Sequence, residues 1–280
     1  MRGRPERRGG RAAGRPRGRT RLLKAVGAGG IALASLLAGL FLAGAPSPAL
    51  AQREPACPNL PVRNPMPREA TPENLPEPYW RARTAELSRV AGRGMGWAQM
   101  IFIGDSITQF WDPPVWEARF GSRGAANFGV GGDFTQGVLW RLQEGGQWPA
   151  TLRPRVAVLL IGTNNATYNN PPEDTALGIA EIVRLIRGRA PATRILLLGI
   201  LPRGADASDP ARALNQRVNA LIAPCADNSS VFYADLGGAL VDSAGRPLPG
   251  VLTDGLHLSP DGYARLGAVL EPRVNALLGR

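Results

Sequence analysis

Met100-Ile101-Phe102-Ile103-Gly104-Asp105-Ser106 joins four consecutive apolar residues to a glycine, an acid and a serine. A short, nearly continuous apolar run of this kind is typical of a strand that is buried on both faces of a parallel sheet. Similar runs follow along the chain at 156–161, 195–201 and 231–233, with a weaker one at 125–128. The sequence therefore predicts five short strands.

Stretches with the helical spacing of apolar residues accompany these strands. They cover residues 79–90, 136–144, 173–189, 210–222 and 260–278. Strands that alternate with helices indicate a three-layer α/β/α fold with a doubly wound, mostly parallel five-stranded sheet. In such a fold the active site lies beyond the carboxyl ends of the strands, where Ser106, Gly131-Gly132 and Asn164 are expected.

The positive charge of the chain is concentrated at its start. The formal net charge of the 280 residues is +11, but residues 1–24 carry ten Arg or Lys against one acid, Glu6, which leaves +2 for everything downstream. The rest of the chain is thus close to neutral, which disfavours nucleic-acid binding by the working domain.

The basic stretch precedes an uncharged segment at 25–45 that is rich in Ala, Leu and Gly. Ala49-Leu50-Ala51 then forms a small-x-small cleavage signature before Gln52. This order predicts a secretory signal peptide over 1–51 and an exported protein, periplasmic or extracellular. There are two alternatives: an uncleaved membrane anchor, because the apolar segment is close to spanning length, and a disordered basic tail.

Residues 52–78 are rich in proline, from Pro55 through Pro78. Proline lacks a backbone donor, so this stretch is expected to be an extended arm rather than a packed element. The folded domain is then expected over residues 79–280.

Both cysteines, Cys57 and Cys225, follow the predicted leader. An even pair in an oxidising compartment can form one disulfide, with two buried free thiols as the alternative. Neither cysteine has metal-ligand spacing, and one histidine with two distant cysteines makes no zinc site. We therefore expect no metal and no other cofactor.

Gly104-Asp105-Ser106 places a serine where a strand ends, and His257 is the single imidazole of the chain. If the serine acts as a nucleophile, His257 is the base, and Asp254, three residues earlier, is placed to orient it. Each motif alone is weak, because Gly-Asp-Ser is often a turn or a helix cap and a lone Asp or His is often a surface residue.

Two further stretches offer hydrogen-bond donors for an oxyanion. Asn127-Phe128-Gly129-Val130-Gly131-Gly132-Asp133 is glycine-rich but lacks the spacing of phosphate-binding and dinucleotide-binding loops. Ile161-Gly162-Thr163-Asn164-Asn165 ends the most apolar run with two amides. A glycine N–H and an amide side chain at strand ends are suited to stabilise an oxyanion, although either stretch is also compatible with a simple turn.

The order and spacing of these four motifs resemble those of the SGNH, or GDSL-type, hydrolases, whose fold is flavodoxin-like. The resemblance is closest to the catalytic subunits of the intracellular, brain-type platelet-activating factor acetylhydrolases. It extends from about Ile101 to about Leu270 and includes the blocks at 138–142 and 199–204.

The resemblance implies a role for each residue of the predicted site. Ser106 is then the nucleophile, and His257 is the general base and later the general acid, oriented by Asp254. The oxyanion hole consists of the Ser106 N–H, the Gly132 N–H and the Asn164 amide, with Gly131 as the alternative to Gly132.

An exported serine esterase that cleaves short acyl esters, acetyl esters above all, is therefore expected. The leader, the proline-rich segment and the cysteines depart from the pattern of the intracellular enzymes. The alcohol portion of the substrate is therefore not specified, and it could belong to a lysophospholipid-like lipid, an acetylated polysaccharide or a small ester. A carbohydrate acetylesterase and a non-catalytic envelope or glycan-binding protein are the alternatives. Phe110, Trp111 and Phe134 flank the motifs and either line a substrate pocket or pack in the core.

Overall fold

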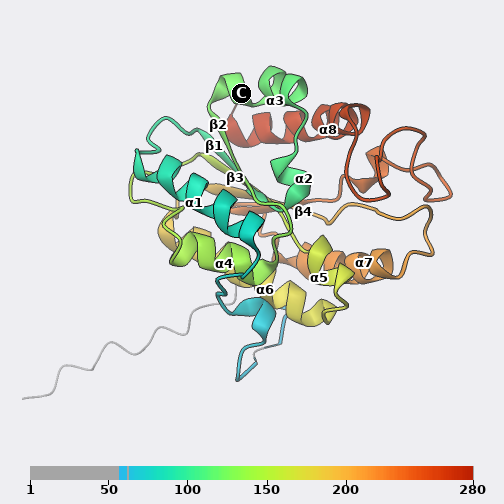
Figure 1. Cartoon of the computed structure of the whole chain (residues 1–280), viewed down its shortest axis with the longest axis horizontal. Helices are drawn as coiled ribbons and strands as arrows, with labels where there is room; N and C mark the ends of the chain where they lie inside the picture. The colour runs from blue at the N-terminus through green and yellow to red at the C-terminus, as the bar shows by residue number, and fades with distance from the viewer. Residues whose placement is uncertain (1–56, 62, 280) are drawn as a thin grey trace, which may run out of the picture. The chain divides into compact units, whose positions relative to one another are not determined.

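The five apolar runs form the strands of one sheet in the order β2-β1-β3-β4-β5 (Figure 1). The computed structural model describes residues 57–61 and 63–279, so the predicted leader over 1–51 lies outside the described part. The strands are Met100–Gly104 (β1), Ala125–Gly129 (β2), Val156–Leu160 (β3), Arg194–Leu198 (β4) and Val231–Ala234 (β5). All neighbouring strands are parallel, which confirms the predicted α/β fold.

Helices cover both faces of the sheet (Figure 1). One face carries α1 (Pro78–Gly92), α4 (Thr135–Gln143), α6 (Pro172–Arg189) and α7 (Pro210–Ile222). The other face carries α3 (Pro113–Arg119) and α8 (Pro260–Leu278). Two short helices, α2 (Ser106–Gln109) and α5 (Thr163–Thr167), follow β1 and β3. Single 3₁₀ turns are η1 (Arg68–Ala70), η2 (Gly121–Arg123), η3 (Ala223–Cys225) and η4 (Gly237–Ala239). Within the described part, no helix is both long enough and apolar enough to cross a bilayer.

The strands are apolar throughout because they are buried on both faces. Successive side chains of a strand point to opposite sides, so Ile101 and Ile103 enter the core under α4 and α6, whereas Met100 and Phe102 enter the core under α8. Each fully buried large apolar side chain contributes about 1.5–3 kcal/mol through removal from water. The two cores together fix the sheet between its helical layers.

The strand order reverses at β1, which lies between β2 and β3. Chains that leave neighbouring strands in opposite directions open a crevice at the carboxyl ends of those strands. Helix α2, the glycine-rich loop after β2 and helix α5 all begin at this edge. The fold thus collects three of the predicted motifs at one place.

The segment before α1 packs against the domain, and the expectation that it is not a packed element is wrong. It has little regular structure beyond η1, in keeping with its prolines. Three of its apolar residues are nevertheless buried in the core beside α1, α4 and α6: Leu60, Ala70 and Leu75. The Thr135 hydroxyl donates to the Glu69 carbonyl oxygen at 2.7 Å, and a Cβ on Gly178 would overlap that same oxygen.

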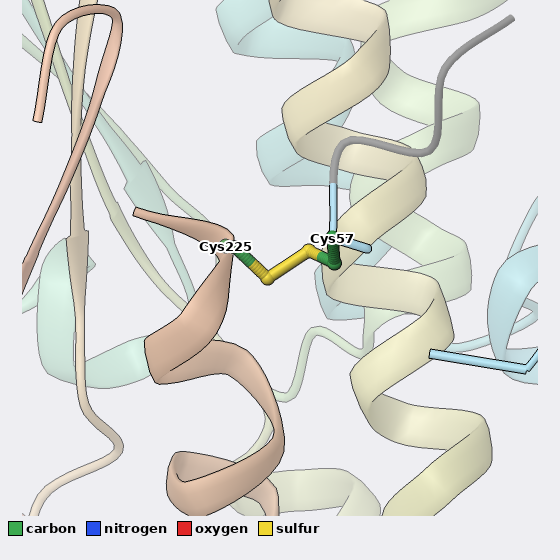
Figure 2. The surroundings of a disulfide bond; sticks show 2 residues. All are labelled: Cys57 and Cys225. Atoms are coloured by element: carbon green, nitrogen blue, oxygen red, sulfur yellow. A yellow bond between two sulfur atoms is a disulfide. The ribbon is translucent and has the colours of Figure 1, made fainter. Parts of the chain in front are cut away.

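A disulfide joins Cys57, near the start of the described chain, to Cys225 in η3 (Figure 2). The two half-cystines are separated by 168 positions in the sequence, and both are buried. Of the two arrangements that the sequence leaves open, the structure has the disulfide. The segment before α1 is therefore held covalently as well as by packing.

Replacing both cysteines by serine is expected to lower the free energy of unfolding by about 2–5 kcal/mol, because the bond restricts the unfolded chain over a long loop. Urea unfolding of the oxidised wild type and of the double variant measures the difference. Reductant should lower the stability of the wild type and leave that of the variant unchanged. Equal stability of the two oxidised proteins would show that the bond contributes nothing.

Candidate active site

Ser106 begins helix α2 directly beyond the carboxyl end of β1. Asp105 caps this helix, and its carboxyl oxygen accepts a hydrogen bond from the Ile107 N–H at 2.9 Å. The turn requires glycine at position 104, because a Cβ there would overlap the carbonyl oxygen of Leu160 on the neighbouring strand. Ser106 is thus fixed in a tight turn, with only 5% of its surface exposed.

Asp254, His257 and Ser106 form one line of hydrogen bonds. His257 Nε2 lies 2.9 Å from Ser106 Oγ, and Nδ1 lies 2.7 Å from Asp254 Oδ2. An ionised carboxylate only accepts hydrogen bonds, so Nδ1 carries the proton and Nε2 presents its lone pair to the serine hydroxyl. The structure therefore brings together three residues that the sequence spreads over 151 positions.

The environment of Asp254 keeps this carboxyl ionised. Its partial burial opposes ionisation, but hydrogen bonds from the His257 ring and from the backbone N–H groups of His257 and Leu256 outweigh burial and lower the pKa of Asp254 to about 2. The two backbone bonds, at 2.8 and 2.9 Å, both go to Oδ1. The negative charge of Asp254 is therefore present at neutral pH, where it stabilises an imidazolium on His257.

Hydrogen-bond donors are available at the carboxyl ends of β1, β2 and β3. Among the described residues, neither the Ser106 N–H nor the Gly132 N–H has an acceptor, whereas the Gly131 N–H donates to Gln109 Oε1 at 2.6 Å. The Asn164 amide directs one N–H to the Asp133 carbonyl oxygen at 2.8 Å and keeps a second N–H. This pattern favours Gly132 over Gly131 as an oxyanion donor, and Gly132 is also the exposed glycine of the two.

The three flanking aromatic residues divide between core and surface. Trp111 is buried against other rings, with the ring of Tyr263 4.9 Å away between centroids. Phe110 is half exposed, and its ring centroid lies 6.0 Å from that of His257. Phe134 packs edge-on against the exposed Tyr168 at 5.3 Å. Trp111 is thus part of the core, and Phe110 lies beside the candidate site.

A family model described as "GDSL-like Lipase/Acylhydrolase family" matches residues 102–265, which include the serine, the acid and the histidine. The chain belongs to this family. The alpha2 subunit of platelet-activating factor acetylhydrolase IB from Rattus norvegicus is 38% identical over 181 residues, which are 64% of this chain and 77% of that protein. The alpha1 subunit from Homo sapiens is 36% identical over 184 residues, 65% of this chain and 78% of that protein.

A solved structure from Streptococcus pneumonia, described as a presumptive platelet activating factor, has a TM-score of 0.62 and 25% identity to this GDSL-like chain. The match covers 70% of this chain and 92% of that one. With the family model and the acetylhydrolase relatives, it identifies the chain as a carboxylic ester hydrolase. In the described part of the chain, no three His, Cys, Asp or Glu side chains are grouped so as to hold a metal ion.

A buried ion pair supports the glycine-rich loop of this GDSL-like protein. Asp133 and Arg141 have no exposed side-chain surface, and their carboxylate and guanidinium lie 2.8 Å apart. Arg141 also donates to the carbonyl oxygens of Phe128 at 3.0 Å and Gly104 at 3.3 Å, at the ends of β2 and β1. Asp133 accepts the indole N–H of Trp80 on α1 at 2.7 Å. The pair therefore connects both strand ends to two helices.

The sequence interpretation missed this pair and its partners. Burial raises the pKa of Asp133 and lowers that of Arg141, and the attraction between the two opposes both shifts. The guanidinium stays charged even so, because its ordinary pKa is far above neutral. A charge inside an otherwise apolar helical stretch, Val138-Leu139-Trp140-Arg141-Leu142, is the signal that could have revealed a buried ion pair.

Asp105 is a second carboxyl with an altered pKa. Its burial raises the pKa to about 7 against the opposing hydrogen bond from the Ile107 N–H, and the negative charge of Asp133 adds to the rise. The pKa of Asp105, which precedes Ser106, is thus above the ordinary value for an aspartate. The pKa of Asp254, which is hydrogen-bonded to His257, is below that value. Such a difference between neighbouring acids is frequent in active sites.

Asp105→Asn is predicted to flatten the pH dependence of stability. The pKa of Asp105 in the folded protein, about 7, lies above the ordinary 3.8, so between these values the folded protein binds more protons than the unfolded chain. The free energy of unfolding of the wild type therefore falls as pH rises through this window, by up to about 4 kcal/mol. Asparagine keeps an acceptor for Ile107 but does not ionise, so urea unfolding of the variant should show little of this fall.

Asp261→Asn, at an exposed position on α8, serves as the matched control and should keep the pH dependence of the wild type. If the free energy of unfolding falls with rising pH by the same amount in Asp105→Asn as in the wild type, the pH dependence of stability comes from other groups.

Proposed function

We propose that the chain hydrolyses short-chain acyl esters, acetyl esters in particular, through an acyl-enzyme on Ser106. The observation that carries this proposal is the continuous hydrogen bonding from Asp254 through His257 to Ser106. An ester hydrolase needs an activated nucleophile, and a hydroxyl is activated by a base whose far side is fixed by an acid.

The first half of the reaction transfers the acyl group to the enzyme. His257 Nε2 takes the proton of Ser106 while Oγ forms a bond to the ester carbonyl carbon. The imidazolium is stabilised by ionised Asp254. The bond to the alcohol oxygen then breaks, and His257 returns the proton to the leaving alcohol.

Charge on the tetrahedral intermediate is stabilised by donors that are already in place. The N–H groups of Ser106 and Gly132 and the second N–H of the Asn164 amide carry this role, at the ends of three adjacent strands. Because these donors belong to the backbone or to a hydrogen-bonded side chain, they need no reorganisation as the charge develops.

The second half of the reaction releases the acid. His257 takes a proton from water, whose oxygen attacks the acyl carbon, and then returns the proton to Ser106 Oγ as the ester bond to the enzyme breaks. The acetyl preference rests on the relatives, which are acetylhydrolase subunits by name.

Ser106→Ala should abolish turnover of p-nitrophenyl acetate by the purified protein, because no nucleophile remains. Asn164→Ala should lose about 100- to 1,000-fold in kcat and keep detectable turnover, since two oxyanion donors remain. Turnover should also decrease from the acetyl ester to longer acyl homologues. Wild-type activity in Ser106→Ala would discard the assignment.

Labelling by a fluorophosphonate provides an independent measurement. The reagent should modify the wild type and Asn164→Ala but not Ser106→Ala. An unlabelled wild type would favour the alternative of a non-catalytic envelope or glycan-binding protein that keeps the fold.

We also propose that the protein is exported. The basic, apolar and small-x-small order of residues 1–51 supports this, and so does the bond between Cys57 and Cys225, because disulfides persist in oxidising compartments. Protein recovered outside the cytoplasm should begin at Gln52. An intact N-terminus in the membrane fraction would instead indicate an anchor, and reduced cytoplasmic protein would contradict export.

A further inference from the structure

A cavity of about 500 Å³ lies beside the turn that carries Asp254 and His257. The segments 203–209 and 247–256 form its walls. The lining side chains include Arg203, Ala205, Asp209, Leu252, Asp254 and Leu256. Neither the nucleophile nor the oxyanion donors line this cavity, so it is distinct from the place where the ester carbonyl reacts.

The cavity is close enough to the serine for one substrate to occupy both. Asp254 lines it and reaches Ser106 across a single imidazole ring through hydrogen bonds of 2.7 and 2.9 Å. The part of an ester that extends past His257 would therefore enter this cavity. Its volume is within the range of about 300–1,000 Å³ that is usual for small-molecule sites.

The two walls are fixed to each other and to the oxyanion side of the site. The Gly204 N–H donates to the Gly255 carbonyl oxygen at 2.7 Å. Arg203 Nη1 donates to Thr167 Oγ1 at 2.6 Å, on the same helix α5 that carries Asn164. The cavity is thus preformed relative to both catalytic groups, which lowers the entropic cost of binding.

Polar groups in the cavity are available to a ligand. Arg203 Nη2 makes no hydrogen bond among the described residues, whereas Nη1 donates to Thr167 Oγ1. Arg203 Nε, 3.9 Å from Asp209 Oδ1, is itself buried, so it is not among the groups that a ligand reaches. The Asp209 and Asp254 carboxylates add acceptors, and Leu252 and Leu256 add apolar surface. Hydrogen-bond donors, acceptors and apolar side chains therefore all line the same cavity.

We propose that this cavity binds the alcohol portion of the ester, and that this alcohol is a neutral group rich in hydroxyls, such as a sugar. The inference rests on the proposed esterase function and names its substrate class. A hydroxyl both donates and accepts, so a polyol satisfies the Arg203 guanidinium and the two carboxylates together. The apolar side chains pack against the C–H groups of the same ring.

The charge balance argues against a phospholipid headgroup in this cavity. Two carboxylates face one guanidinium, so a phosphate would bring a further negative charge to a site that already carries one in excess. A quaternary ammonium is recognised by aromatic faces, and the described residues that line the cavity include no aromatic side chain.

Filling the cavity tests the inference. Ala205→Trp changes an exposed residue that lines the cavity, and Ala207→Trp is its matched control on the same loop outside the lining. For acetylated xylobiose, Ala205→Trp should raise KM at least tenfold, and Ala205→Leu should raise it by less. For p-nitrophenyl acetate, whose leaving group has no hydroxyls to bind, kcat/KM of all three variants should stay within about twofold of the wild type.

Unchanged sugar-ester kinetics in Ala205→Trp, with normal p-nitrophenyl acetate turnover, would overturn the cavity assignment and leave the esterase proposal intact. If an acetyl ester of lysophosphatidylcholine is the better substrate and is the one that Ala205→Trp weakens, the assignment of a neutral, hydroxyl-rich alcohol is overturned, and the esterase proposal again stays intact. A wild type that hydrolyses none of these esters would overturn both proposals.

Discussion

The ion pair of Asp133 and Arg141 is the contact on which the architecture of the site depends. The guanidinium donates to the carbonyl oxygens of Gly104 and Phe128, near the carboxyl ends of β1 and β2, while the carboxylate accepts the indole N–H of Trp80. Removing one partner of such a buried pair leaves an uncompensated charge, at a cost of about 3–5 kcal/mol. The backbone of Asp133 also accepts the Asn164 amide, so the same residue orients a side chain at the end of β3.

The pKa values of two carboxyl groups near the reacting atoms are shifted in opposite directions. Asp105 is fully buried, and its pKa is raised to about 7. Asp254 is partly exposed and accepts three hydrogen bonds, and its pKa is lowered to about 2. The negative charge of Asp254, beside the imidazole, is thus permanent, whereas that of Asp105, beside the serine, is only partial near neutral pH. Had Asp105 remained fully ionised, its charge would oppose the oxyanion that forms on the same turn.

The strands and most helix ends were predictable because burial on both faces leaves long apolar runs with turn residues at their ends. The run at 195–201 is an instructive exception, because β4 ends at Leu198. Ile200 leaves the sheet and pairs its N–H and C=O with the Asn219 amide at 2.7 and 3.0 Å. An asparagine side chain can thus satisfy the backbone N–H and C=O that a neighbouring strand would otherwise pair. An apolar run looks the same in the sequence whether a strand or a side chain makes these hydrogen bonds.

The candidate site was predictable to the extent that the chain offers a single imidazole and few polar strand ends. What decides between Gly131 and Gly132 is the hydrogen bond that the Gly131 N–H donates to the Gln109 side-chain oxygen, which no local sequence pattern contains. Burial of the proline-rich segment likewise depends on contacts with α4 and α6, which are distant in sequence.

The disulfide turns residues 57–225 into a closed covalent ring, with Ser106, Gly132 and Asn164 inside it and Asp254 and His257 on the tail that follows. A protease that cuts once within the ring leaves a single molecule. A cut between Cys225 and Asp254 severs the acid–base pair from the nucleophile, and that fragment is then retained only by non-covalent contacts, among them the packing of α8 on the sheet. Resistance to proteolysis is therefore unequal along the chain, and the link after η3 is where one broken bond separates the two halves of the proposed catalytic machinery.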